Sequence, residues 1–230
     1  MVRTLISASV VAIMSGSAMG QQVFFNDFNS NIPAEIGGFI NNIGVQGFNG
    51  LGNLGNIFSG NFLYNDSTGN PAAATTLTIN NLPSHTSISI GFLLAIIDSW
   101  DSTNGAPSPD FFNVTVDSVS VFQATFAIQS GSANYNPPIN GDIGNGLASR
   151  GFSGFNDRAY DMSLESSLQN IPHTASSVTI SFFASGNGWQ GGGDESWGID
   201  NLNVGVIPAP TTLAGFALLG VCAGRRRRVR

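Results

Sequence analysis

The fold is decided by residues 87–97, which read SISIGFLLAII. Large apolar side chains occupy every second position of this stretch, at Ile88, Ile90, Phe92, Leu94 and Ile96. Successive side chains of a β-strand point to opposite faces of its sheet, so a period of two is the pattern of a strand. We therefore predict one long, mostly buried strand here.

Shorter stretches on both sides of this strand alternate in the same way, and we predict strands at residues 23–28, 77–79, 112–116, 119–126, 160–164, 178–182 and 197–204. Asp117 and Ser118 form a predicted turn, and a slip in the alternation near Asp200 indicates a β-bulge. No segment between the termini has a long apolar stripe of period 3.6, which excludes a major helix. The predicted fold is all-β, a two-sheet antiparallel sandwich of jelly-roll type over residues 21–206.

A weak internal repeat supports two sheets. The sequence NLPSHT at residues 81–86 precedes the long strand, and NIPHT at residues 170–174 precedes the predicted strand at 178–182. One such strand in each sheet suits a sandwich whose inner faces pack together. The histidines of the two copies, His85 and His173, are the only histidines of the chain. We expect them to be hydrogen-bonded structural residues at the strand starts rather than catalytic groups.

Residues 37–60 differ from the rest, because glycine and asparagine recur there between isolated large apolar residues. This composition predicts a long irregular loop with turns. Its apolar residues should hold it against the sandwich, and a disordered linker is the alternative.

The charges are few and unevenly distributed. Only 10% of the residues are charged, and no lysine is present. Residues 21–210 hold all fourteen acidic residues against two arginines, a formal charge of −12. Such a body is a poor partner for nucleic acid, whose phosphates need a basic surface. It would attract divalent cations, or serve solubility alone. The single cysteine, Cys222, excludes an intramolecular disulfide and a cysteine-based zinc site.

Residues 1–20 have the pattern of a signal peptide. Arg3 supplies the positive start and residues 5–14 a short apolar stretch, followed by small residues at Ala18 and Gly20 before the predicted cleavage site. The apolar stretch is too short to span a bilayer. A cleaved signal implies export through the inner membrane, and an uncleaved anchor is the alternative.

Residues 207–230 combine a short proline motif, an apolar segment and a basic end. The motif is Pro208-Ala209-Pro210, and residues 213–223 carry no charge. The basic end is a cluster that holds the C-terminus on the cytoplasmic side. Residues 207–224 are long enough for a transmembrane helix, and a plain membrane anchor is one reading of them. The cluster consists of Arg225, Arg226, Arg227 and Arg228.

This tail resembles a PEP-CTERM sorting signal, the tag by which exosortase recognises its substrates. Pro208 and Pro210 match the two prolines of the family pattern, and the arginine cluster matches its basic end, while Ala209 replaces the usual glutamate. The resemblance covers about the last 25 residues. It implies that the protein is anchored in the inner membrane, cut near the motif by an exosortase-type membrane protease, and released to the cell surface or an extracellular matrix.

The carboxylates predict a metal site. One group follows the long strand and a second group surrounds the start of the last strand, and in a sandwich such loops can meet at one end. A hard cation with oxygen ligands would remove their mutual repulsion, which predicts a structural Ca²⁺ ion. The segments loosely resemble loops of calcium-bearing jelly-roll or lectin-like modules, and solvated loop acids are the alternative. The predicted ligands are Asp98, Asp101, Asp110, Asp194, Glu195 and Asp200.

The sequence favours a non-enzymatic, exported surface or exopolysaccharide-matrix protein, with no catalytic residue assigned. A carbohydrate-binding module is the alternative, because Trp100, Trp189 and Trp197 could stack on a sugar, although tryptophans beside sandwich loops are as often packing residues. A glycoside hydrolase is the third reading and would need two carboxylates at a set separation. The chain has no GxSxG motif, and its glycine-rich residues 186–193 do not form a phosphate loop.

Overall fold

The computed structural model describes residues 20–103, 108–128, 135–152 and 154–210. Nearly all of the predicted signal peptide and all of the predicted tail beyond Pro210 lie outside these residues. Within them the regular structure is β-strand, apart from three 3-10 helices of three residues each: η1 (Gln46–Phe48), η2 (Met162–Leu164) and η3 (Ser166–Leu168). In the described ranges no helix is long and apolar enough to cross a membrane.

The larger sheet, here called sheet A, has seven strands and is built on two long ones. These are β8 and β14, which run antiparallel to each other over almost their whole length. β11 and β12 pair with the other edge of β8, and β6 and β1 pair with successive parts of β14. The strands are β1 (Gln21–Asn26), β3 (Asn41–Gly44), β6 (Asn61–Asn65), β8 (His85–Asp98), β11 (Arg158–Asp161), β12 (Ile171–Pro172) and β14 (Glu195–Pro208).

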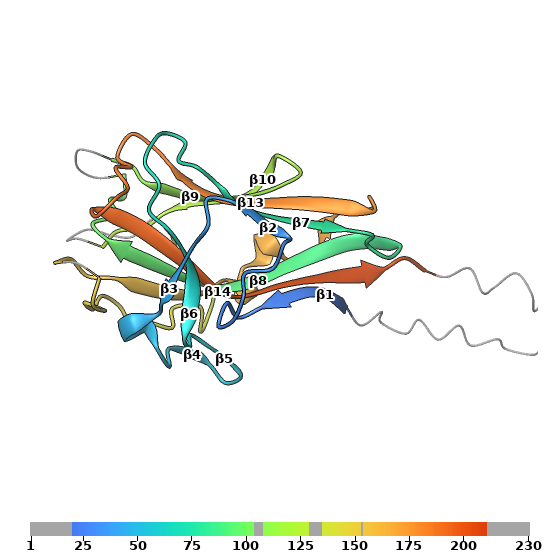
Figure 1. Ribbon diagram of the computed structural model, residues 1–230, viewed down its shortest axis with the longest axis horizontal. Helices are drawn as coiled ribbons and strands as arrows, with labels where there is room; N and C mark the ends of the chain where they lie inside the picture. Colours follow the sequence, from blue (N-terminus) through green and yellow to red (C-terminus); the bar gives the residue numbers. More distant parts are fainter. Residues whose placement is uncertain (1–19, 104–107, 129–134, 153, 211–230) are drawn as a thin grey trace, which may run out of the picture.

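The smaller sheet, sheet B, has five antiparallel strands in the order β10-β9-β13-β7-β2. A separate hairpin of β4 (Gly52–Asn53) and β5 (Asn56–Ile57) lies on the outer side of sheet A (Figure 1). The strands of sheet B are β2 (Ile36–Gly38), β7 (Thr75–Asn80), β9 (Phe111–Val116), β10 (Val119–Thr125) and β13 (Ser177–Ser185).

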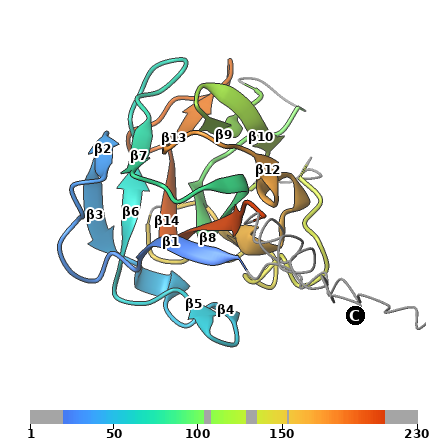
Figure 2. The ribbon, with the colours of Figure 1, turned by 90° about the vertical axis from the view of Figure 1, so that its right-hand side faces the viewer.

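The two sheets face each other across one aromatic core, as the end-on view in Figure 2 shows. Phe92 of β8 meets Phe182 of β13 with ring centroids 5.3 Å apart, and Trp197 of β14 meets Phe112 of β9 at 5.2 Å. All four rings are buried. The alternating side chains of β8 and β13 thus fill a single space from opposite sides. The prediction of an all-β, two-sheet antiparallel sandwich is confirmed.

A second core covers part of the outer face of sheet A. The outward residues Leu93, Ala95 and Ile97 of β8 are fully buried against Phe48 and Phe58. Both phenylalanines come from the segment predicted as an irregular loop, which lies against the sandwich as expected. The segment is less irregular than predicted, because it contains β2, β3, η1 and the β4–β5 hairpin.

Over the other half of that outer face, the part of the chain that the structure describes forms no second core. The outward residues of β8 there are Ser87, Ser89 and Gly91, and β14 contributes Asn203 and Gly205. None of them is a large apolar side chain, so a second layer would gain little by packing on them. We call this region the open half of sheet A.

Local features of the prediction divide into confirmed and wrong ones. The Asp117–Ser118 turn joins β9 to β10 with both residues at positive φ, and the register of β14 shifts between Asp200 and Asn203, where a bulge was expected. The strand predicted at residues 160–164 is wrong in its second half. The Asp161 side chain accepts the backbone N–H of Ser163, and this cap starts η2 instead of continuing β11.

Gly198 offers a test of the second core. A Cβ atom at this position of β14 would lie 1.6 Å from the Phe62 ring. We expect Gly198→Ala to destabilise the protein by about 1–3 kcal/mol, the usual cost of overpacking a filled core. Gly154→Ala is the control, since a Cβ there has no atom within 4 Å. Urea unfolding measures both variants, and equal stabilities would contradict the close packing of Phe62 on β14.

Candidate functional site

A groove crosses the open half of sheet A. It consists of two adjoining hollows of about 290 and 250 Å³, which share Gly91, Ser163 and Asn203. The floor is made by β8 and β14, and two glycines in it, Gly91 and Gly205, leave room above the backbone. The sheet is therefore hollowed where the second core ends.

The walls of the groove come from distant parts of the chain. Gln22 of β1 stands on one side, and Ser163 and Gln169 from the η2–η3 region stand on the other. At one end the ring of Phe25 is 51% exposed beside Asn56 of the β4–β5 hairpin. The residues that line the two hollows include no charged side chain.

Hydrogen bonds fix the amides of the groove. The Gln169 side chain donates to the carbonyls of Ile90 and Ser163 at 3.1 and 3.2 Å. The Asn201 side chain donates to Asn56 Oδ1 and to the Ile57 carbonyl, both at 3.0 Å. These amides are held in place before any ligand arrives.

Asn203 differs from these amides. Its Oδ1 is buried and accepts no hydrogen bond, although the residue lies where the two hollows meet. Such an oxygen lacks a donor that water or a ligand hydroxyl would supply.

The three tryptophans lie elsewhere, in the core. Trp100 and Trp197 have no exposed surface and Trp189 is 6% exposed. Trp100 and Trp189 pack edge to face with centroids 5.1 Å apart, and their ring N–H groups donate to the carbonyls of Ser196 and Ser67. No ring face is open to a ligand, which corrects the prediction that these residues stack on a sugar.

Three of the six predicted metal ligands come together at one end of the sandwich. Asp101, Asp110 and Glu195, here called the acidic cluster, place carboxylate oxygens within 4.8 Å of one another. Asp101 follows β8, Asp110 precedes β9 and Glu195 begins β14, so both sheets contribute. Asp110 and Glu195 are fully buried, and burial raises the pKa of both carboxyl groups, which also hydrogen-bond to each other.

The other predicted ligands are placed differently. Asp194 is near enough for its charge to raise the pKa of Asp110 and Glu195 further, and its Oδ1 accepts the Ser99 hydroxyl at 2.8 Å. Asp98 is opposite Glu195 in the ladder, but its backbone N–H donates to Asp157 and its charge acts on that residue. Asp200 lies outside the acidic cluster, and this corrects the predicted ligand set.

Asp200 is instead a buried link to the segment before β6. Its carboxylate accepts the backbone N–H groups of Ser59 at 3.1 Å and Asn201 at 2.7 Å. Burial nevertheless raises the pKa of Asp200 to about 7, with a smaller contribution from the charge of Asp27. The residue therefore titrates near neutral pH in the folded protein.

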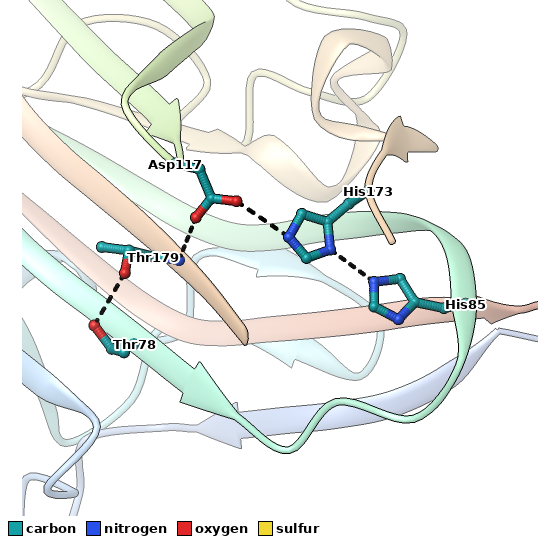
Figure 3. A network of polar contacts seen from close by, with 5 residues as sticks. All are labelled: Thr78, His85, Asp117, His173 and Thr179. Carbon is teal, nitrogen blue, oxygen red and sulfur yellow. Dashed lines mark hydrogen bonds and ion pairs between the residues drawn. The ribbon is translucent and has the colours of Figure 1, made fainter. Parts of the chain in front are cut away.

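The two histidines form one polar line with Asp117 (Figure 3). His85 Nδ1 donates to the Pro83 carbonyl at 2.6 Å, His85 Nε2 lies 2.7 Å from His173 Nδ1, and His173 Nε2 lies 3.1 Å from Asp117. The pair thus joins the two copies of the repeat, as expected of structural residues.

The sequence reasoning missed the groove, although a signal for it was present. Along β8 the outward positions change from Ser87, Ser89 and Gly91 to Leu93, Ala95 and Ile97. Small and polar outward residues mark an uncovered sheet, and apolar ones mark a covered sheet. The boundary between the two halves of the outer face can be read from this change.

Comparisons with known proteins give likenesses of shape only. No family model matches the chain, and no curated protein matches it. The CBM22-1 xylan-binding domain of Xyn10C from Paenibacillus barcinonensis is similar with a TM-score of 0.39 and 6% identity, covering 85% of this chain and 100% of that one.

Two other solved structures are similar over part of their own length. The CBM22-1–GH10 modules of Clostridium thermocellum xylanase 10B are similar with a TM-score of 0.38 and 8% sequence identity. The match covers 84% of this chain and 30% of that one. The tailspike protein 4 of bacteriophage CBA120 is similar with a TM-score of 0.33 and 17% sequence identity. This match covers 76% of this chain and 20% of that one. TM-scores of this size carry no functional argument, so what the chain binds has to be inferred from its own residues.

Asp200 predicts a pH dependence of stability. Its pKa is about 7 in the folded protein and about 4 in an unfolded chain. Between these values the folded state holds a proton that the unfolded state has released, so stability falls as the pH rises from about 4 to about 7. We expect Asp200→Asn to reduce the slope of the free energy of unfolding against pH over this range. Urea unfolding at several pH values measures this slope. Glu35→Gln, which changes an exposed acidic residue, is the control and should leave this slope as it is. An unchanged slope in Asp200→Asn would contradict the assignment of the pH dependence to Asp200.

Proposed function

We propose that this protein binds neutral polysaccharide in the groove on the open half of sheet A. The observation that carries the proposal is the lining of the groove, which is made of amides, hydroxyls and glycine backbone with one exposed aromatic ring and no charge. This corresponds to the carbohydrate-binding alternative of the sequence analysis, at a site that the sequence analysis did not select.

The lining suits sugar hydroxyls. The amides of Gln22 and Asn203 carry both donors and an acceptor, while Gln169, whose N–H groups donate to two backbone carbonyls, contributes its acceptor oxygen. A hydroxyl group of a sugar likewise donates and accepts. The unpartnered Oδ1 of Asn203 is one acceptor that such a hydroxyl can satisfy. Phe25 offers an apolar ring face at one end, against which the C–H face of a pyranose can pack. Because no charged group lines the groove, it favours neutral over acidic polymers.

The groove supports binding rather than catalysis. Glycoside hydrolysis needs two carboxyl groups flanking the scissile bond, and the two hollows are lined by none. The acidic cluster starts at Glu195, eight residues before Asn203 along β14, which is roughly 25 Å of strand. We therefore infer a non-enzymatic protein.

Export and sorting belong to the same proposal. The signal-peptide pattern and the PEP-CTERM-like tail support export, anchoring in the inner membrane, processing by an exosortase-type protease and release to the cell surface or extracellular matrix. Pro208 is the last residue of β14 and Ala209 donates its N–H to the Ser84 carbonyl, so the proline motif follows the sandwich without a linker. The jelly-roll type of the sandwich also remains part of this proposal.

Two variants test the glycan site. Phe25→Ala should weaken binding about tenfold, because it removes the stacking surface. Gly205→Val should abolish binding by filling the floor, while a Cβ at Gly205 meets no atom closer than 3.7 Å and the fold should accept it. Affinity electrophoresis in gels with soluble neutral glucans, mannans or xylans measures the binding, and a polyuronate gel serves as the charged comparison.

Val119→Ala is the matched control for these variants, because Val119 is 66% exposed on β10 of the other sheet. It should bind like the unchanged protein. Binding that survives both groove variants would place any glycan site elsewhere, and release of new reducing ends from the polymers would contradict the non-enzymatic part of the proposal.

The sorting tail has its own test. Mass spectrometry of the mature protein should find neither residues 1–20 nor the arginine cluster. Replacing Arg225, Arg226, Arg227 and Arg228 with serine should impair retention and processing, because these charges stop translocation of the tail. An intact C-terminus in cells with active exosortase would contradict the proposed processing.

A further inference from the structure

The acidic cluster joins three chain segments that backbone hydrogen bonds already hold in place. The N–H of Asp101 donates to Oδ2 of Asp110 at 2.5 Å, and the N–H of Asp110 donates to the carbonyl of Asp101 at 3.0 Å. The N–H of Gln190 donates to Oε2 of Glu195 at 2.7 Å. One oxygen of each buried carboxylate is thus fixed by the backbone, which also sets the direction of the other oxygen.

Those other oxygens have no amide donor. Oδ1 of Asp110 and Oε1 of Glu195 are both buried and have no hydrogen-bond partner outside the pair of carboxyl groups, and neither side chain has any exposed surface. An ionised carboxylate withdrawn from water is costly unless a positive group or hydrogen bonds replace its hydration. Two such oxygens in one cluster point to a cation.

The described residues do not supply that cation. Arg150 directs its guanidinium to the Gly144 carbonyl and the Phe48 ring, and Arg158 directs its own to the Ala127 carbonyl. These are the two arginines among the described residues, and the chain has no lysine. Asp194 adds further negative charge beside the cluster. The acidic cluster therefore has no basic partner within the described residues.

We propose that Asp101, Asp110 and Glu195 bind one Ca²⁺ ion at this end of the sandwich. The ligand atoms are all carboxylate oxygens, the donors that hard cations prefer, and the cluster has no nitrogen or sulfur ligand to favour zinc. Their separations of up to 4.8 Å can be spanned by an ion that binds each oxygen at about 2.3–2.6 Å. Water completes the six to eight ligands of such an ion.

The ion ties the two sheets together. Asp101 lies beyond the end of β8 and Glu195 begins β14, both of sheet A, while Asp110 leads into β9 of sheet B. Trp100 precedes Asp101 and donates its ring N–H to Ser196, the neighbour of Glu195. The ion therefore stabilises the end of the sandwich under which the Trp100–Trp189 pair is packed, and it lies far from the groove.

The test uses full-length protein freed of metal with EDTA and then supplied with CaCl₂ or MgCl₂. Equilibrium dialysis with ⁴⁵Ca should find one ion bound per chain. The melting midpoint should rise by about 5–10 °C when Ca²⁺ exceeds its dissociation constant a hundredfold. Mg²⁺ should raise it less, because Mg²⁺ keeps its own waters and requires a strict octahedron. No bound calcium, or an unchanged midpoint, would overturn the proposal.

Two variants separate binding from folding. Asp110→Asn and Glu195→Gln should each abolish the calcium-dependent rise, yet in EDTA they should melt at or above the unchanged protein, because each removes a buried acidic group that has no basic partner among the described residues. Asp66→Asn, outside the cluster, should keep the full response. A variant that melts lower in EDTA but still responds to Ca²⁺ would contradict the assigned ligands. The glycan assay reports on the groove alone, so either proposal can fail without the other.

Discussion

The antiparallel ladder between β8 and β14 is the constraint on which the rest of the structure depends. It runs from the pair Asp98–Glu195 at one end to the pair His85–Pro208 at the other, with a single break near Asp200 and a shift at the last pair. Both strands send alternate side chains into the core against sheet B. β11 and β12 pair with β8, β6 and β1 pair with β14, and β3 joins the sheet through β6. The acidic cluster lies at the Asp98–Glu195 end of this ladder, and the histidine pair lies at the His85–Pro208 end.

The outer face of the β8–β14 ladder has one apolar half and one half of small and polar residues. Where β8 turns large apolar residues outward, the segment containing Phe48 and Phe58 covers it and makes a second core. Where β8 and β14 turn Ser89, Gly91 and Asn203 outward, no apolar layer from the described residues covers the sheet, and a groove lined by no charged residue remains. The second core and the groove therefore lie on different halves of the same pair of strands, which lets the groove keep polar and small residues without weakening the core.

The sequence predicted what depends on local pattern. The alternation at residues 87–97, the turn at Asp117, the bulge at Asp200 and the two-sheet arrangement all follow from short-range rules. The packing of residues 37–60 against the sandwich was predicted, but not that this segment covers Leu93 and Ile97, because that depends on contacts between distant segments. The burial of the tryptophans was equally hidden, since a tryptophan beside a loop has the same sequence signal whether it packs inward or faces a ligand.

The acidic residues show where strand geometry could have improved the prediction. Asp200 and Glu195 are five residues apart on one extended strand, roughly 16 Å, which is too far to share an ion. Asp101 and Asp110 are nine residues apart, and only the fold of the connecting segment brings them together. The distance along a strand is thus predictable from sequence, whereas the closure of a loop is not.

The position of β14 also determines how the body responds to tension. β14 ends at Pro208, and its neighbour β1 begins at Gln21 beside Val206, so both chain ends leave from the same end of the sandwich (Figure 1). A pull on the C-terminal end acts along the axis of β14, while the hydrogen bonds to β8 and β1 lie across that axis. The bonds are then strained together in shear instead of opening one after another. A body pulled through this strand therefore resists with many hydrogen bonds at once.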